Sequence, residues 1–444
     1  MKAIILAVFL AGLGLAGAAS ALAAAPSGRD LPPGLVIPEA ARPGPDFDVE
    51  RATAAYLELL SPEQRRLSDA YFEGGYWLQL FGFLYGLGVA ALLLWGGISR
   101  RLRELARRLS ARPWLYTWAY GVLAVLAWFV LDLPWSIYAD FVREHQYGLA
   151  TQDFAGWFGD ALKSLLVSAI VVPPALVAVY AAVRRAGARW WIVASGLAFV
   201  FALIALMLAP VYVEPLFNTY RPLREGPVRE AVLSLARANG VPTDHVVEFD
   251  ASRQTTRISA NVAGFAGTTR IALNDNLLDK TSLPEIKAVL GHEMGHYVLN
   301  HGLRLTVYLT LVFALGFWVV HRLLDAALAR LGPRLGLENR GDPAALPLAV
   351  AIFSAFLLLA TPLLNSIVRQ AEAEADAFGL NAAREPHGFA MAAIRLSAYR
   401  KLHPGPLEEI VFYDHPSGYA RVHAAMTWFR ENQDNPTANA PPTR

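Results

Sequence analysis

Six long apolar runs constrain this chain more than any other feature of its sequence. Each is about 19 to 25 residues long, enough for a helix to cross the ~30 Å hydrocarbon core of a bilayer. Since 55% of the residues are hydrophobic and only 17% are charged, burial of every run in one soluble core is a poor alternative. We therefore expect a polytopic membrane protein whose partner is the lipid bilayer, with spans near residues 76–98, 114–138, 161–183, 190–212, 303–321 and 345–368.

The charge and the cysteine content exclude several classes of function. The formal net charge of +2 is too small to indicate a nucleic-acid partner, which a strongly basic chain would. The chain has no cysteine, so disulfides, thiolate metal sites and cysteine nucleophiles are excluded. The sequence leaves the oligomeric state open.

The first 25 residues have the features of a secretory signal peptide. Lys2 is followed by an apolar stretch to Leu15 and by the cleavage pattern Ala21-Leu22-Ala23. An uncleaved first membrane helix is the alternative, although the apolar stretch is short for a span. Residues 26–72 are predicted to form an exported linker with short helices, the second of which begins at Pro62 after Ser61 as N-cap.

Polar segments separate the remaining chain into alternating membrane and non-membrane parts. The predicted order is an N-terminal membrane region of four helices at 73–212, a polar segment at 213–302, two further membrane helices at 303–368, a helical segment at 369–430 and a disordered tail at 431–444. In the first polar segment we expect a helix over 227–239 and short strands over 245–249, 257–264 and 269–273. Ser282 and Glu285 then form a capping box that begins a second helix.

That second helix carries the motif HEMGH, residues 292–296, which matches H-E-x-x-H. His292 and His296 are four residues apart, so they lie on one helix face and can bind one cation. Glu293 lies about 100° further round the helix, where it can accept a proton from a metal-bound water. Surface histidines on an amphipathic helix are the alternative, and His301 is assigned to that class because it lies beyond the ligand spacing.

A third protein ligand has to come from another helix. The segment RQAEAEADAFGL, residues 369–380, offers Glu372, Glu374 and Asp376 just after the last apolar run. On a helix Glu372 and Asp376 share a face, whereas Glu374 points elsewhere. One carboxylate of the pair can bind zinc while the other accepts the N–H of a ligand histidine. A solvated acidic helix face is the alternative.

These two motifs resemble those of the integral-membrane zinc endopeptidases called type I CAAX prenyl proteases, which are gluzincins. Further segments resemble the same family in the same order, so the resemblance covers residues 75 to 430. It implies one Zn²⁺ bound by His292, His296 and Glu372, with Glu293 as catalytic base and Asp376 beside a ligand histidine. The further segments are LPWSIYADFVREHQYG (133–148), EPLFNTYRPLREG (214–226), SANVAGFAGTTRIALNDNLL (259–278) and HPSGYAR (415–421).

The resemblance also implies residues that bind the substrate. A strand before the zinc helix would pair with the substrate backbone, because an exposed strand edge holds an extended peptide without recognising its side chains. His415 would donate to the oxyanion of the tetrahedral intermediate, and Arg421 would pair with a carboxylate near the zinc helix. The strand residues are Asn261, Val262, Ala263 and Gly264.

The expected fold is a mainly α multi-spanning membrane protein with an inserted α+β zincin-like metalloprotease domain. The resemblance further implies that the helices enclose a water-filled chamber with the metal facing into it. Asp132, Asp160 and Lys163 lie within or near the predicted spans. Charged groups at such positions fit the interior of a chamber, where water can solvate them.

The predicted function is zinc-dependent hydrolysis of peptide bonds in peptide or protein substrates, in the processing and quality control of membrane or envelope proteins. A catalytically idle membrane scaffold or chaperone is one alternative, which the intact catalytic positions disfavour. A transporter is another, but it gives no reason for the two motifs. We identify no prenyl-binding pocket in the sequence, and the Ala- and Arg-rich composition is typical of bacteria. Prenylation of the substrate is therefore left open.

Basic residues in the short loops predict the orientation in the membrane, because loops rich in Lys and Arg stay in the cytoplasm. The loop at about 139–160 on the other side has only Arg143. We therefore expect a bacterial inner-membrane protein whose active site faces the periplasm, although eukaryotic members of the family are understood to face the cytosol. The cytoplasmic arginines would be Arg100, Arg101, Arg103, Arg107, Arg108, Arg112, Arg184, Arg185, Arg189, Arg322, Arg330, Arg334 and Arg340.

Overall fold

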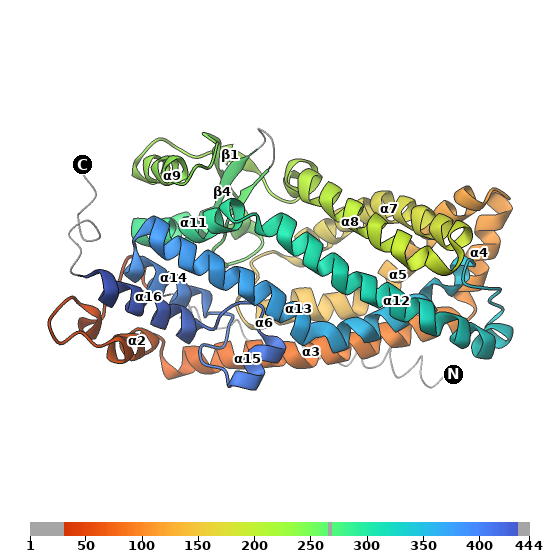
Figure 1. Cartoon of the computed structure of the whole chain (residues 1–444), viewed down its shortest axis with the longest axis horizontal. Coiled ribbons are helices and arrows are strands. Elements are labelled where there is room, and N and C mark those ends of the chain that lie inside the picture. Colours follow the sequence, from red (N-terminus) through yellow and green to blue (C-terminus); the bar gives the residue numbers. More distant parts are fainter. Residues whose placement is uncertain (1–30, 265–268, 434–444) are drawn as a thin grey trace.

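The computed structural model describes residues 31–264 and 269–433. The predicted signal peptide or first helix at 1–25 lies outside the described residues, as does most of the predicted tail. Figure 1 shows an elongated molecule in which long helices run side by side along the length, with the small sheet and several short helices gathered at one end. We call this end the catalytic end, and the opposite end, where α4 (Ile98–Leu109) lies, the basic end.

Six helices in the described part of the chain are long and apolar enough to cross a membrane. Many of their large apolar side chains are exposed, including Leu311 and Leu359, as expected of surfaces that face lipid. The mainly helical membrane fold is confirmed, and the number of candidate spans equals the predicted number. The helices are α3 (Pro62–Trp95), α5 (Pro113–Ser136), α7 (Phe154–Arg185), α8 (Trp190–Leu208), α12 (His301–Leu335) and α13 (Leu346–Ala383).

Two of these helices run through boundaries that the sequence had suggested. Ser61 caps α3 in a capping box with Gln64, but the helix continues into the first span, so the boundary at residue 72 falls inside it. Similarly, α13 continues past residue 368 to Ala383. No residue near either boundary breaks a helix, since Gly74 and Gly75 only weaken it. Apolar and polar stretches therefore share one helix.

The described part of the segment before α3 has a short helix, as predicted for residues 26–72, but it packs against the protein instead of forming a linker. It contains η2 (Glu39–Ala41) and α2 (Val49–Leu57), which form one hydrophobic core with α14 (Pro386–Leu396) and α16 (Gly418–Asn432). The Tyr56 hydroxyl lies 2.8 Å from Nδ1 of His387. Arg395 donates to the carbonyl oxygens of Leu31, Pro32 and Gly34. The segment is therefore packed against the catalytic end.

The inserted sheet has the strand order β1-β2-β4-β3. The strands β2 (Val246–Phe249) and β4 (Arg270–Asn274) are parallel, and β3 (Ala260–Ala263) pairs with β4 in antiparallel register, with Asn261 opposite Ala272. The three predicted strands are present, although the second is shorter than predicted. The sequence analysis missed β1 (Tyr220–Pro222), which has only three residues and ends at a proline.

The helix α11 (Leu283–Val298) begins at the predicted capping box, where the Ser282 N–H donates to Glu285 at 2.8 Å. Two glycines bring α11 close to α13. A Cβ on Gly291 would lie 2.9 Å from the Gly379 carbonyl oxygen, and one on Gly379 would lie 2.7 Å from the His292 nitrogen. Side chains at these positions would separate the helices, so the glycines allow α13 to present its acids to α11.

Shorter elements complete the described chain. Asn300, with φ of 55°, ends α11 and redirects the chain into α12. The predicted helix at 227–239 is present as α9 (Pro227–Ala238). The others are η3 (Ile137–Val142), α6 (Arg143–Gln146), η4 (Gly187–Arg189), η5 (Ala209–Val213), η6 (Glu214–Leu216), η7 (Ala251–Arg253), α10 (Asp275–Lys280), η8 (Pro343–Ala345) and α15 (Pro406–Phe412).

Candidate metal centre and active site

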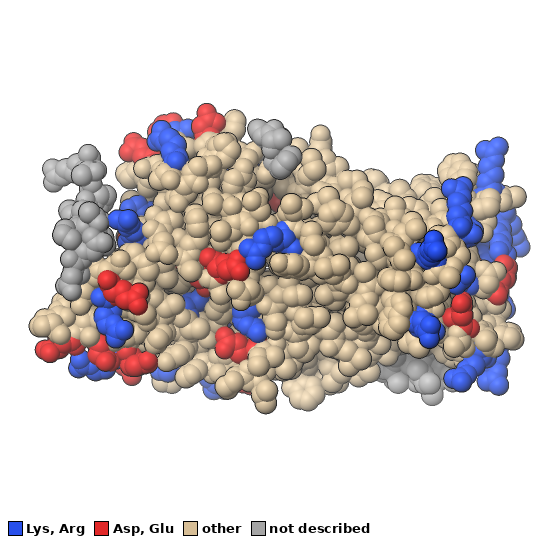
Figure 2. Space-filling model, in the orientation of Figure 1, with Lys and Arg blue, Asp and Glu red and all other residues tan. Residues whose placement is uncertain are grey.

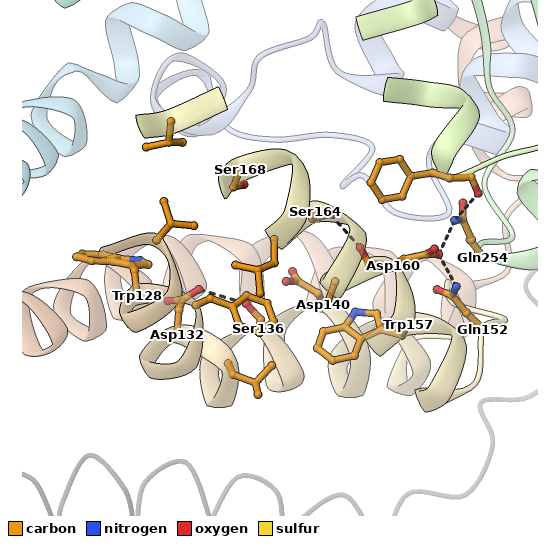
Figure 3. A pocket seen from close by; sticks show the side chains of 17 residues that line it. Trp128, Asp132, Ser136, Asp140, Gln152, Trp157, Asp160, Ser164, Ser168 and Gln254 are labelled. Atoms are coloured by element: carbon orange, nitrogen blue, oxygen red, sulfur yellow. Dashed lines mark hydrogen bonds between the residues drawn. The ribbon is translucent and has the colours of Figure 1, made fainter. Parts of the chain in front are cut away.

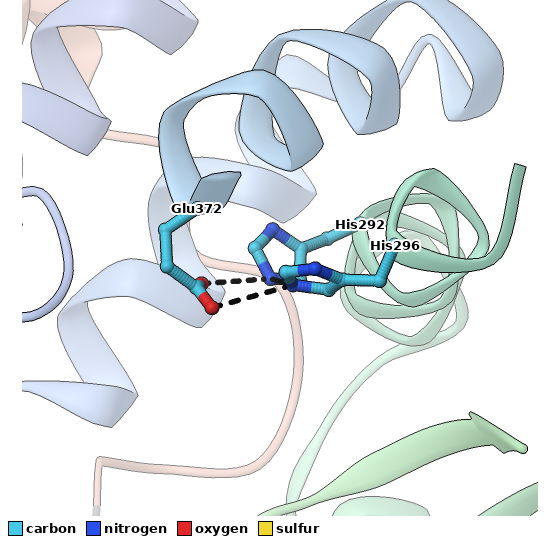
Figure 4. Close-up of side chains that lie close together, drawn as sticks. All are labelled: His292, His296 and Glu372. Atoms are coloured by element: carbon cyan, nitrogen blue, oxygen red, sulfur yellow. Dashed lines mark hydrogen bonds and ion pairs between the residues drawn. The ribbon is translucent and has the colours of Figure 1, made fainter. Parts of the chain in front are cut away.

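Three side chains from two helices converge at the centre of the catalytic end. His292 and His296 come from α11, and Glu372 comes from α13 (Figure 4). One ligand atom from each lies within 4.8 Å of the other two, and the two Nε2 atoms are 3.1 Å apart. The Oε2 of Glu372 is buried without a hydrogen-bond partner among the described residues. Two imidazoles, a carboxylate and an unsatisfied buried oxygen fit a zinc-type metal ion.

The ring of His292 is fixed from behind by Asp376. Nδ1 of His292 donates to Oδ1 of Asp376 at 2.7 Å, and Arg421 donates to both carboxylate oxygens of Asp376 at 2.8 Å each. Burial disfavours a charged His292, but the carboxylates of Asp376 and Glu372 beside it outweigh burial and raise the pKa of His292 to about 9. The carboxylate of Asp376 orients the ring by accepting from Nδ1, and Nε2 points at Oε2 of Glu372, 3.2 Å away.

The ring of His296 has a different partner, which the sequence analysis missed. Its Nδ1 lies 2.9 Å from Nδ1 of His301, and Nε2 of His301 lies 3.2 Å from Oε2 of Glu374. His301 is 1% exposed, so its assignment to surface histidines is wrong. The spacing could not reveal this contact, because it depends on the helix break at Asn300, a residue type that tolerates the left-handed conformation.

Glu293 lies beside the histidines and faces a cavity of about 220 Å³. Its carboxylate is partly accessible from that cavity but is otherwise surrounded by protein. Burial raises the pKa of Glu293, although the charges of His292 and His296 oppose the shift. A carboxylate whose pKa is raised in a cleft is suited to exchange protons near neutral pH.

His415 reaches the same centre from the segment before α16. Its Nε2 lies 3.2 Å from Oε2 of Glu372, and its Nδ1 lies 2.8 Å from Oδ1 of Asp414. The neighbouring Asp414 therefore fixes the ring so that Nε2 points into the cavity. His415 and Arg421 both line that cavity, together with Tyr399 and Arg400.

The predicted substrate-binding strand lies at the edge of the described sheet. Asn261, Val262 and Ala263 belong to β3, and Gly264 follows with φ of 116°. The cavity beside Glu293 is lined by Ile258, Ser259 and Ala260, which immediately precede or begin this strand. The strand therefore starts at the cavity and leads away from it.

A second cavity, of about 610 Å³, lies between α5 and α7 (Figure 3). Asp132 and Asp160 line it together with Asp140. Lys163 lies beside it, where Nζ donates to Asp160 and to the Leu216 carbonyl oxygen at 2.9 Å each. Acidic groups within or next to the long helices thus face a cavity whose other walls are largely apolar, and water in a chamber of the kind that the resemblance implies would solvate them.

Comparisons with known proteins agree with this geometry. A family model described as CAAX prenyl protease N-terminal, five membrane helices, matches residues 50–219, and one described as peptidase family M48 matches residues 222–429. The uncharacterized metalloprotease YhfN of Bacillus subtilis is 29% identical over 85% of this chain and 89% of its own length. CAAX prenyl protease 1 of Saccharomyces cerevisiae is 32% identical over 42% of each chain. The crystal structure of S. mikatae Ste24p has the same fold, with a TM-score of 0.69 and 23% identity over 83% of this chain and 89% of that one.

The fold, the three converging ligands and these matches define an integral-membrane metalloendopeptidase. The chain belongs to the CAAX prenyl protease family of membrane metalloproteases, peptidase family M48. Membership implies a metal ion, generally zinc, and a peptide or protein substrate. The expected recognition, fold class and enzyme class are thereby confirmed, and a transporter is set aside.

Proposed function

We propose that this metalloendopeptidase binds one Zn²⁺ through His292, His296 and Glu372 and cleaves membrane or envelope proteins at the periplasmic side of a bacterial inner membrane. The observation that carries the metal assignment is the convergence of these three side chains, whose ligand atoms lie within 4.8 Å of one another. Zinc in such a site supplies Lewis-acid activation of the attacking water and of the scissile carbonyl.

The residues around the ligands carry out the remaining steps of the reaction or hold the ligands in place. Glu293 takes a proton from the attacking water and returns it to the leaving amine, a role that its raised pKa favours. In its doubly protonated form His415 donates from Nε2 to the oxygen that becomes negative in the transition state, while its Nδ1–H donates to Asp414, which holds the ring. Arg421 fixes Asp376, which in turn fixes His292.

The edge of β3 is the proposed binding site for the substrate backbone. β3 pairs with β4 on one side only in the described sheet, so an extended peptide can add to its free edge beside the cavity. Such pairing uses backbone hydrogen bonds and recognises side chains weakly. This mode favours a broad range of unfolded or extended substrates and supports a role in quality control. The strand residues are Asn261, Val262, Ala263 and Gly264.

The distribution of charge supports the proposed orientation. On the face that Figure 2 shows, the charged side chains of the basic end are mostly Lys and Arg, whereas those of the catalytic end are Lys and Arg mixed with Asp and Glu. Residues that flank the three basic connections belong to two buried clusters, which share the start of α13 and so place these connections at one end of the bundle. Because basic loops are retained in the cytoplasm, the catalytic end then faces the periplasm.

Labelling of single cysteines tests this orientation, since the chain has none of its own. Asp279→Cys at the catalytic end and Asn339→Cys at the basic end both replace exposed side chains. A membrane-impermeant thiol reagent on intact spheroplasts should label the first and spare the second, and permeabilised cells should show both labelled. The reverse pattern in spheroplasts would place the active site in the cytosol.

The catalytic proposal is tested with the purified full-length protein in detergent. We expect about one zinc per chain, cleavage of an extended peptide, loss of cleavage with a chelator and recovery with added zinc. A protein that binds no zinc, or that binds it without cleaving any of a diverse peptide library, would contradict the proposal. Proteins that accumulate in cells with Glu293→Gln, compared with cells that have the intact enzyme, would identify the substrates.

A further inference from the structure

The two histidines of the metal site are held in different ways. His292 donates directly to a carboxylate, Asp376, which is paired with Arg421. His296 contacts the imidazole of His301 instead, and that imidazole contacts Glu374. Arg304 in turn donates to both oxygens of Glu374, at 2.7 and 3.3 Å. A carboxylate and an arginine thus lie behind each of the two histidines. Behind His296, however, the imidazole of His301 lies between the histidine and its carboxylate.

The hydrogen bonds fix where the protons lie in this chain. Nε2 of His296 lies 3.4 Å from Oε1 of Glu372 and faces the metal centre, so it has to be free of hydrogen. The proton of a neutral His296 is then on Nδ1, and Nδ1 of His301 has to accept it. His301 must therefore keep its own proton on Nε2, which is the atom that points at Glu374.

The positions of His301, Arg304 and Glu374 are set by the helices α12 and α13. His301 is the first residue of α12, after the left-handed Asn300, and its side chain is 1% exposed. Arg304 lies one turn further along α12, and Glu374 lies on α13 between Glu372 and Asp376. Gln370 also donates to Glu374, at 3.1 Å. The carboxylate is thus held by three side chains that do not reach the metal centre.

From this geometry we propose that His301, oriented by Glu374 and Arg304, is a positioning residue that fixes the ring and tautomer of His296 for metal binding. The proposal rests on the proposed metal site. It also gives the two histidines different neighbours. Asp376 places a full negative charge next to His292, whereas the imidazole of His301 keeps the charge of Glu374 one ring further from His296. Outer partners of this kind typically alter metal affinity by about 10- to 100-fold.

The test compares His301→Leu with His301→Asn in the full-length protein. Leu fills the buried space but cannot accept a hydrogen bond, whereas the Asn side-chain oxygen can occupy the position of Nδ1 and accept from His296. Zinc affinity is measured by competition with a chromophoric chelator, and the site is also examined through the visible absorption of bound Co²⁺. We expect His301→Leu to bind zinc about 10- to 100-fold more weakly with an altered Co²⁺ spectrum, and His301→Asn to restore most of the affinity.

If His301→Leu does not fold, variants of the neighbouring carboxylates test the same inference. Glu374→Gln changes a side chain that is 29% exposed, and we expect an affinity loss smaller than that of His301→Leu. Asp376→Asn provides the matched change behind His292. Zinc binding at wild-type affinity in both His301→Leu and Glu374→Gln would overturn this inference alone. An equal loss in His301→Asn and His301→Leu would also overturn it, because packing rather than hydrogen bonding would then matter. A wild-type protein that binds no zinc would overturn the proposed function as well.

Discussion

The two ends of the molecule use the same kind of residue in opposite ways. At the catalytic end, Arg421 and Asp376 form a pair whose side chains are only 8% and 9% exposed. At the basic end, the side chains of Arg100 and Arg107 are 45% and 37% exposed. A buried arginine that is paired with a carboxylate fixes the geometry of its neighbours, whereas exposed arginines contribute their charge to the surface potential. Burial therefore decides whether an arginine serves the chemistry or the orientation in the membrane.

This comparison predicts that single changes at the catalytic end have large effects, and that changes at the basic end have small ones. The largest effect is expected for Glu293→Gln, which should retain zinc and lose activity by about 10²- to 10⁴-fold, the usual contribution of a positioned general base. Glu293 is outside the ligand set, so its removal spares the three ligands. Metal analysis beside a peptide-cleavage assay checks both statements. A variant that cleaves at the wild-type rate would refute the assigned role.

The next largest effect is expected from acid, which should lower the folding stability of the catalytic end. Burial lowers the pKa of His387 from 6.5 to about 4, so the unfolded chain binds this proton more tightly. The contribution of neutral His387 to stability is complete above pH 6.5 and is lost as the pH falls towards 4, by up to about 3 kcal/mol. Unfolding in detergent should therefore depend less on pH between 6.5 and 4 in His387→Gln than in the wild type. Parallel pH curves would show that His387 is not responsible.

A smaller effect is expected for Asp376→Asn, which leaves the ligands in place but weakens the hold on His292. We expect a loss of about 10- to 100-fold in zinc affinity or activity. This change also leaves the buried Arg421 without its charge partner. The double variant Asp376→Asn/Arg421→Gln separates the two causes. If the double variant regains stability but not zinc affinity, the metal effect belongs to Asp376.

The smallest effect is expected at the basic end. Arg101 and Arg108 are exposed on α4, and their replacement by Gln should change peptide cleavage less than about twofold, as for ordinary surface substitutions. Arg103 is the matched contrast, because it donates to the buried Asp342 at 2.5 Å. Arg103→Gln should lower the thermal stability measurably. A strong loss of cleavage in Arg101→Gln/Arg108→Gln would break the proposed division between the ends.

Features set by local spacing could be predicted from the sequence. The lengths of the apolar runs predicted the spans, and the i, i+4 spacing of His292 and His296 placed both rings on one face of α11. The contact between His296 and His301 could not be predicted in this way, because it depends on a backbone reversal at Asn300. The packing of residues 31–60 on α14 and α16 depends on long-range contacts that no periodicity records. Sequence reasoning therefore identified the three side chains that converge, which are the proposed ligands, but missed part of their support.

Because α13 is continuous, the catalytic end is joined covalently to the membrane-spanning part. The same helix crosses the apolar region and then carries Glu372 and Asp376. A cut or truncation in the apolar part of α13 would separate Glu372, a proposed metal ligand, from the part of the chain that carries His292 and His296, and a fragment with all three also contains the span α12. The enzyme therefore cannot be shed from the membrane as an active soluble fragment. Its activity is confined to the surface of the bilayer by covalent structure, without any need for a separate inhibitor of the released form.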